Sequence, residues 1–169
     1  MGTSYISTTD GPLAEELSEL ADGSISLFVV LPILREMCVS DSRAVALARF
    51  EKLISEHLAH LDGILGDVLL RRDHCDGDLT RSLFRSLTHL RIRPASTARD
   101  LEILGVVQQA QVFLVGSCGF ALRFARSAQA DEAVRVLEES LLRLGAQVGQ
   151  YTVSEYVSEL AYARPGTAA

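Results

Sequence analysis

Residues 101–125, LEILGVVQQAQVFLVGSCGFALRFA, decide the fold of this chain. Buried-type residues recur here at alternating steps of three and four, a spacing that places them on one face of an α-helix. That face consists of Leu104, Val107, Gln111, Leu114, Cys118, Ala121 and Ala125. The helix is predicted over residues 98–127, and Thr97 and Asp100 have the spacing of a capping box at its start. A long helix with one apolar face buries that face against other helices.

Three further segments have the same periodicity and predict three more long helices. The first covers residues 13–38, where the internal Pro32 predicts a bend or a lost hydrogen bond about one turn earlier. Its stripe is Leu13, Leu17, Leu20, Ser24, Leu27, Leu31, Leu34 and Cys38. The second covers residues 43–70, with Phe50, Ile54, Leu58 or Leu61, Leu65 and Val68. The last starts near Asp131 and carries Val134, Leu137, Leu141, Leu144, Val148 and Tyr151.

A long connection separates the second and third of these helices. It begins with a polar loop over residues 73–78, continues as a short amphipathic helix that Asp78 could cap, and ends at Pro94. The apolar residues of that short helix are Leu79, Leu83, Leu87 and Leu90. Ferritin-like bundles use one such crossover. We therefore expect an all-α, ferritin-like antiparallel four-helix bundle with a short extra helix, forming one domain over residues 12–162 between flexible termini at residues 1–11 and 163–169.

Composition narrows the possible classes of protein. A chain of 169 residues that is 48% hydrophobic suits one core, and its net charge of −6 disfavours binding to a phosphate backbone. Three widely spaced cysteines imply no disulfide framework and fit a reducing compartment. The first ten residues lack the pattern of a signal peptide, and the longest apolar run is shorter than the roughly 20 residues that span a bilayer. These features predict a cytoplasmic protein that binds neither nucleic acid nor membrane.

Several residues at matching spacings resemble the YciF-type family of ferritin-like proteins. They are Leu31-Pro32, Cys75, Arg99-Asp100, Gln108, Gly119, Ala133 and the segment LEESL at residues 137–141. The resemblance implies a four-helix bundle, often a dimer, in a family linked to stress responses without a settled activity. It also implies acidic residues on facing helices, arranged as in a di-metal carboxylate site.

The chain departs from the family at the metal ligands. Ser24, Gln111, Leu114 and the pair Arg143-Leu144 stand where the family has glutamates. Ser24 and Gln111 are either relics of an altered site or a buried polar pair satisfied by hydrogen bonds. We expect the second, with Gln111 bonded to Ser24 or His57, because serine and neutral glutamine are poor metal ligands.

Only the second long helix keeps possible ligands. Glu56 and His60 are four residues apart and can face the same way, which makes them weak metal candidates, whereas His57 lies closer to the apolar face. We expect a solvated pair, a core histidine and a bundle centre without metal. The loop over residues 73–78 faintly resembles a calcium loop but lacks the closing glutamate.

No catalytic residue or cofactor-binding motif is predicted. Cys38 and Cys118 lie on core stripes, and the aspartates around Cys75 disfavour its thiolate. Arginines on or beside the crossover form either a basic edge for an acidic partner or a solvated helix face, and we expect the solvated face. They are Arg71, Arg72, Arg81, Arg85, Arg91 and Arg93.

A second apolar stripe on the first and third long helices predicts a homodimer. Its residues are Val30, Ile33 and Met37 on the first helix, and Val106, Phe113, Gly116 and Phe120 on the third. The crossover helix could cover one of these stripes but hardly both. The leading interpretation is thus a non-catalytic bundle that self-associates or binds a protein partner. The alternatives are a metal-binding, iron-handling or oxidase-type protein with a site near Glu56 and His60, and a small-molecule binder in the bundle core.

Overall fold

The computed structural model describes residues 11–65 and 77–147, which form five helices and short connecting segments. No strand occurs in these residues, so the predicted all-α class is confirmed. The helices are α1 (Pro12–Met37), α2 (Asp41–Leu65), α3 (Asp78–Arg91), α4 (Thr97–Ser127) and α5 (Asp131–Gln147). The predictions for residues 1–10, for 66–76 and for 148–169 lie outside the described residues.

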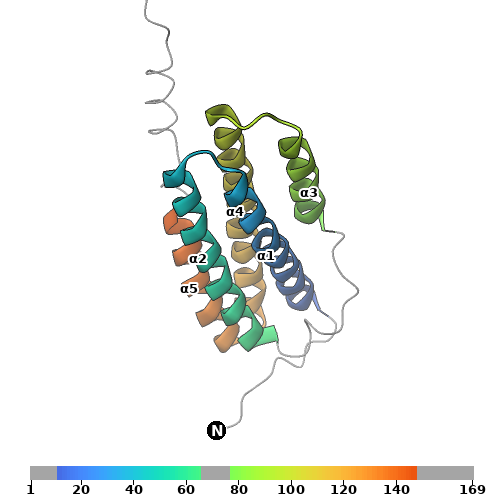
Figure 1. The fold of residues 1–169 in the computed structure, drawn as a ribbon. Helices are drawn as coiled ribbons and strands as arrows, with labels where there is room; N and C mark the ends of the chain where they lie inside the picture. The colour runs from blue at the N-terminus through green and yellow to red at the C-terminus, as the bar shows by residue number, and fades with distance from the viewer. Residues whose placement is uncertain (1–10, 66–76, 148–169) are drawn as a thin grey trace, which may run out of the picture.

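The four longer helices pack lengthwise around a shared core (Figure 1). Helix α1 packs against α2 and α4, and α5 packs against the same two helices from the other side. Helix α3 lies outside this group and contacts both α1 and α4. Its four predicted core leucines, Leu79, Leu83, Leu87 and Leu90, are buried.

The predicted core stripes are confirmed for the two central helices. On α1, every stripe residue from Leu13 to Leu34 is buried, and Cys38 beyond the helix end is partly buried. On α4, the whole stripe from Leu104 to Ala125 is buried, with Gln111 among its members. On α2, Leu61 is fully buried and Leu58 only partly, which decides between the two residues that the sequence leaves open.

Helix α1 continues through Pro32, so the first predicted helix is one element. Proline has no backbone N–H, and the carbonyl of Phe28 one turn earlier therefore loses its helical donor. Leu31 and Leu34 on either side of the proline are fully buried. Burial of Leu31 and Leu34 thus stabilises the helix where Pro32 removes a hydrogen bond. The bend predicted near Pro32 stays a prediction.

Two of the predicted helix caps are wrong by one residue. Ser96, not Thr97, caps α4, because its Oγ accepts a hydrogen bond from the Arg99 amide at 3.2 Å. Gly77 precedes α3 without any side-chain cap, and the Asp78 carboxylate instead accepts from the Arg81 guanidinium at 2.6 Å. Both errors have one cause: neighbouring residues of capping type leave the first helical residue undetermined in the sequence.

Because Ser96 caps α4, the Asp100 side chain is available for a tertiary role that the sequence did not indicate. Its fully buried carboxylate accepts hydrogen bonds from the amides of Val39 at 3.0 Å and Ser40 at 2.9 Å. The guanidinium of Arg43 lies 3.5 Å away as counter-charge. The neighbouring Arg99 donates to the carbonyl of Met37 at the end of α1. This pair joins the start of α4 to the turn between α1 and α2.

Helix α3 contacts α1 and α4 together but leaves Gly116 and Phe120 of the second α4 stripe exposed, as expected of a helix that could hardly cover both stripes. On α1, Ser26 Oγ lies 2.7 Å from Thr80 Oγ1 of α3, and Val30 is fully buried. A Cβ at Gly23 would lie 3.0 Å from Leu79 Cδ2 of α3 and 3.8 Å from Phe113 of α4. Gly23 therefore permits the close approach that lets α3 contact α1 and α4 together.

The predicted interface residues are thus divided between interior and surface. Val30 is buried within the chain, and Ile33 and Phe113 are partly buried against the core. Phe120 remains 55% exposed, and Gly116 is exposed. Packing within the chain accounts for the first three residues, and the last two of the five face solvent.

Replacing Asp100 with alanine should lower the free energy of unfolding by about 3 kcal/mol, because the change removes the ion pair between Asp100 and Arg43 and the acceptor of the Val39 and Ser40 amides. Urea denaturation measures this loss. Glu132→Ala, which removes an exposed ion pair with Arg135, is the control and should cost less than about 0.5 kcal/mol. A loss of equal size in the two variants would contradict the role assigned to Asp100.

Candidate functional site: a polar layer in the core

Four of the buried polar residues come one from each of the four longer helices and lie on the core-facing sides of these helices. These residues are Ser24 on α1, His57 on α2, Gln111 on α4 and Ser140 on α5, and none is more than 3% exposed. Ser24, His57 and Gln111 were singled out in the sequence. Ser140 was missed, although its position between Leu137 and Leu144 on the buried face of α5 could have revealed it.

The predicted hydrogen bond of Gln111 exists, but its partner differs from both expected ones. Gln111 Nε2 donates to the backbone carbonyl of Leu144 at 2.8 Å. Ser24 instead donates from Oγ to the Leu20 carbonyl of its own helix at 2.7 Å. A serine hydroxyl inside a helix reaches the carbonyl one turn earlier with little conformational cost, which leaves Gln111 to bond across to α5.

His57 is a neutral core histidine. Its Nδ1 lies 3.0 Å from Ser140 Oγ, within hydrogen-bond distance across the α2–α5 contact. Burial, followed by the charge of the nearby His60, lowers the pKa of His57 to about 4. His57 Nε2 and Gln111 Oε1 are buried and have no hydrogen-bond partner among the described residues. The interior therefore holds polar atoms but no carboxylate from these four residues.

The weak metal candidates Glu56 and His60 lie outside this layer. The Glu56 carboxylate is 3.4 Å from the Arg143 guanidinium and 3.8 Å from the Lys52 ammonium, and its side chain is 44% exposed. Arg143 also pairs with Glu139 at 2.6 Å. Two cations thus neutralise the one carboxylate that the pair offers. Among the described residues, no group of three or more His, Cys, Asp and Glu side chains could hold a metal ion.

The two described cysteines are poor nucleophiles. Burial raises the pKa of Cys118 to about 12, and its Sγ donates to the Leu137 carbonyl at 3.4 Å. Burial, followed by the charge of Asp100, raises the pKa of Cys38 to about 11. Both thiols are protonated at neutral pH and lack thiolate reactivity. Cys75 and most of the loop that resembles a calcium site lie outside the described residues.

A surface hollow of about 500 Å³ lies at the turn between α4 and α5. Arg126, Gln129, Asp131 and Val134 line it, and it is open to solvent. This hollow lies at the end of the helix pair and not at the bundle centre, where the sequence suggested space for a small molecule.

Comparison with known proteins adds no identity: no protein-family model, curated protein or solved structure matches the chain. Helices α1 and α4 are each long and apolar enough to cross a membrane by length and composition alone. The core helix of a soluble protein meets the same criteria, and 61% of the apolar window in α1 is buried against the other helices.

The lowered pKa of His57 predicts a pH-dependent stability. The unfolded chain takes up a proton near pH 6.5 and the folded chain only near pH 4, so the free energy of unfolding should fall as the pH drops through this window. The total loss from this group is about 3 kcal/mol. Urea denaturation between pH 7 and 4 measures it, and His57→Phe should remove this contribution.

The matched control is His89→Gln, since His89 is exposed on α3. This variant should keep the pH dependence of the unaltered chain. Parallel pH profiles for the unaltered chain and His57→Phe would show that His57 does not carry the effect.

Proposed function

We propose that this protein is a ferritin-like four-helix bundle, built from α1, α2, α4 and α5, that has no catalytic metal centre and acts in the cytoplasm through self-association. The observation that carries the proposal is the chemistry of the interior. The residues that the family resemblance places at ligand positions, Ser24, Gln111, Leu114 and Leu144, are all buried and uncharged. A di-metal centre needs several anionic or imidazole ligands converging from the four helices.

The contact between α4 and α5 supports the correspondence with the family. The resemblance places Gln111 and Leu144 at ligand positions on different helices, and the two residues are joined by a hydrogen bond of 2.8 Å. Arg143, the other residue at the α5 position, pairs with Glu56 and Glu139 at the surface. An uncharged hydrogen bond thus occupies the place where the family would bring two carboxylates to a metal. The role in stress responses that the resemblance implies belongs to the same proposal.

Self-association is favoured by the aromatic side chains that α4 leaves in solvent. Phe120 is 55% exposed and Phe124 is 36% exposed, and they are four residues apart on one side of the helix. Neighbouring exposed phenylalanines with no cover in the described part of the chain are typical of an interaction surface. A second copy of the chain is the simplest partner, since two-fold pairing is the commonest oligomer.

Metal analysis tests the first part of the proposal. Protein purified without chelators should contain far less than one equivalent of iron, manganese or zinc per chain, because Ser24, Gln111, Leu114 and Leu144 provide no anionic ligand. Elemental analysis by plasma mass spectrometry measures the content. Stoichiometric metal that is lost in Glu56→Gln and His60→Gln would instead establish the iron-handling alternative.

Light scattering at micromolar concentration tests the second part. The mass should be twice the 18.4 kDa of the single chain. Phe120→Asp should lower it to the single-chain value, because a carboxylate would be buried in an apolar contact. Leu142→Asp, which alters a 76% exposed leucine on α5, is the control and should leave the mass unchanged. A mass of 18.4 kDa for the unaltered chain would reject self-association.

A further inference from the structure

We propose that the protein forms a two-fold dimer in which the outer face of α3 from each copy docks on the acidic, aromatic flank of the other copy. The outer face of α3 is defined by Phe84, Arg85 and Thr88. The flank is defined by Glu16 and Glu19 of α1 together with Phe120 and Phe124 of α4. This inference rests on the self-association proposed above and specifies its interface.

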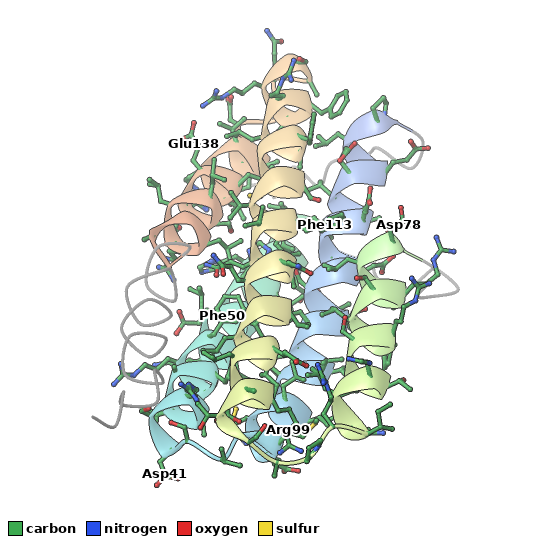
Figure 2. The ribbon with its side chains drawn as sticks, turned by 90° about the horizontal axis from the view of Figure 1, so that it is seen from above. Asp41, Phe50, Asp78, Arg99, Phe113 and Glu138 are labelled. Carbon is green, nitrogen blue, oxygen red and sulfur yellow. The ribbon has the colours of Figure 1, made fainter. Side chains whose placement is uncertain are left out.

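The flank exists because α3 is shorter than the helices it covers. Figure 2 shows α3 starting at Asp78 beside Phe113, while α1 and α4 extend past that point. Leu79 and Thr80 contact the face of α1 that carries Gly23 and Ser26. Past the N-terminal end of α3, toward the start of α1 and the end of α4, no helix in the described part of the chain covers this side of α1 and α4.

The α1 side of the flank is acidic. Glu16, Glu19, Gly23 and Ser26 follow one another at steps of three and four, so the two glutamates continue the face that α3 covers farther along. No lysine or arginine occurs from Pro12 to Leu34. The pKa of Glu16 is raised above its ordinary value, first by burial and then by the charges of Glu19 and Glu15. These carboxylates therefore repel one another and lack a counter-charge on their own helix.

The α4 side of the flank is aromatic. Phe113, Phe120 and Phe124 share one face of α4 at steps of seven and four. Phe113 is partly buried where α3 begins, whereas Phe120 and Phe124 lie farther along and are 55% and 36% exposed. The apolar face that α3 covers at Phe113 thus continues into solvent beside the glutamates.

The outer face of α3 has the complementary chemistry. Its only acidic residue, Asp78, pairs with Arg81. Arg85 is exposed and makes no ion pair within the described residues, and the adjacent Phe84 is 46% exposed. An aromatic ring and a guanidinium on one helix face match the phenylalanines and glutamates of the flank, and opposite charges across an interface favour the correct pairing.

A second copy is favoured as the occupant because every chain carries both halves of the contact. The outer face of α3 and the flank lie on the same side of the molecule, one on either side of the start of α3 (Figure 2). A two-fold axis near the N-terminal end of α3 brings the outer face of α3 of each copy onto the flank of the other copy. The same contact therefore forms twice in the dimer. Nucleic acid is disfavoured, because the acidic flank and the net charge of −6 repel phosphates.

Charge reversal on both halves tests the arrangement. In Arg85→Glu the altered α3 would face Glu19 of an identical copy, and in Glu19→Arg the altered flank would face Arg85. Each variant alone should therefore dimerise about tenfold more weakly or worse, since like charges meet at both contacts. In a dimer of one variant with the other, the glutamate introduced by Arg85→Glu meets the arginine introduced by Glu19→Arg, and at the second contact the unaltered Arg85 meets the unaltered Glu19. Both contacts then join opposite charges, so an equimolar mixture should recover the mass of the dimer in light scattering.

The matched control is Arg49→Glu, which reverses an exposed charge on α2 and should leave the dimer intact. All three altered residues are at the surface, and far-ultraviolet circular dichroism should show unchanged helicity. A monomeric unaltered chain would overturn both the self-association and this interface. An unaltered dimer that persists in both single variants, or single variants that dissociate without rescue on mixing, would overturn this interface alone.

Discussion

Burial of α1 on three sides is the constraint on which the rest of the structure depends. This helix packs against α2, α3 and α4, and it has no charged residue between Asp22 and Arg35. A helix so poor in charge needs neighbours around most of its circumference. Gly23 lets α3 and α4 approach closely, and Asp100 secures the turn that leads from α1 into α2. Helices α2, α3 and α4 are positioned so that they bury the apolar surface of α1.

The buried polar residues Ser24, His57, Gln111 and Ser140 carry no formal charge at neutral pH. His57 and Ser140 interact across α2 and α5, and Gln111 bonds to the α5 backbone at Leu144. A core of this kind favours one helix arrangement over alternatives, because each polar group finds its partner only when the helices are in the right alignment. These four residues offer no anionic oxygen to a cation, and the buried carboxylate of Asp100 is occupied by two amides and Arg43.

The crossover helix α3 shapes that surface. By covering only part of α1 and α4, it converts one apolar stripe into interior and leaves the continuation of the same stripe in solvent. Its own outer face adds arginine and phenylalanine beside the exposed flank. The length of α3 therefore determines both surfaces of the proposed dimer contact, its own outer face and the exposed flank. The glutamates on α1 and the arginine on α3 make these two surfaces complementary in charge.

The sequence by itself determined the helices and their buried faces, because helical periodicity is a local property of the chain. The stripes of α1 and α4, the amphipathic α3 and the absence of carboxylates at Ser24, Gln111 and Leu144 all follow from residue types and their spacing. Only the tertiary structure decided which groups meet. The bond from Gln111 to Leu144, the burial of Asp100 under the α1–α2 turn and the contacts of α3 with both α1 and α4 depend on distances between helices. Those distances depend on how side chains of different helices pack, and no spacing along one helix encodes them.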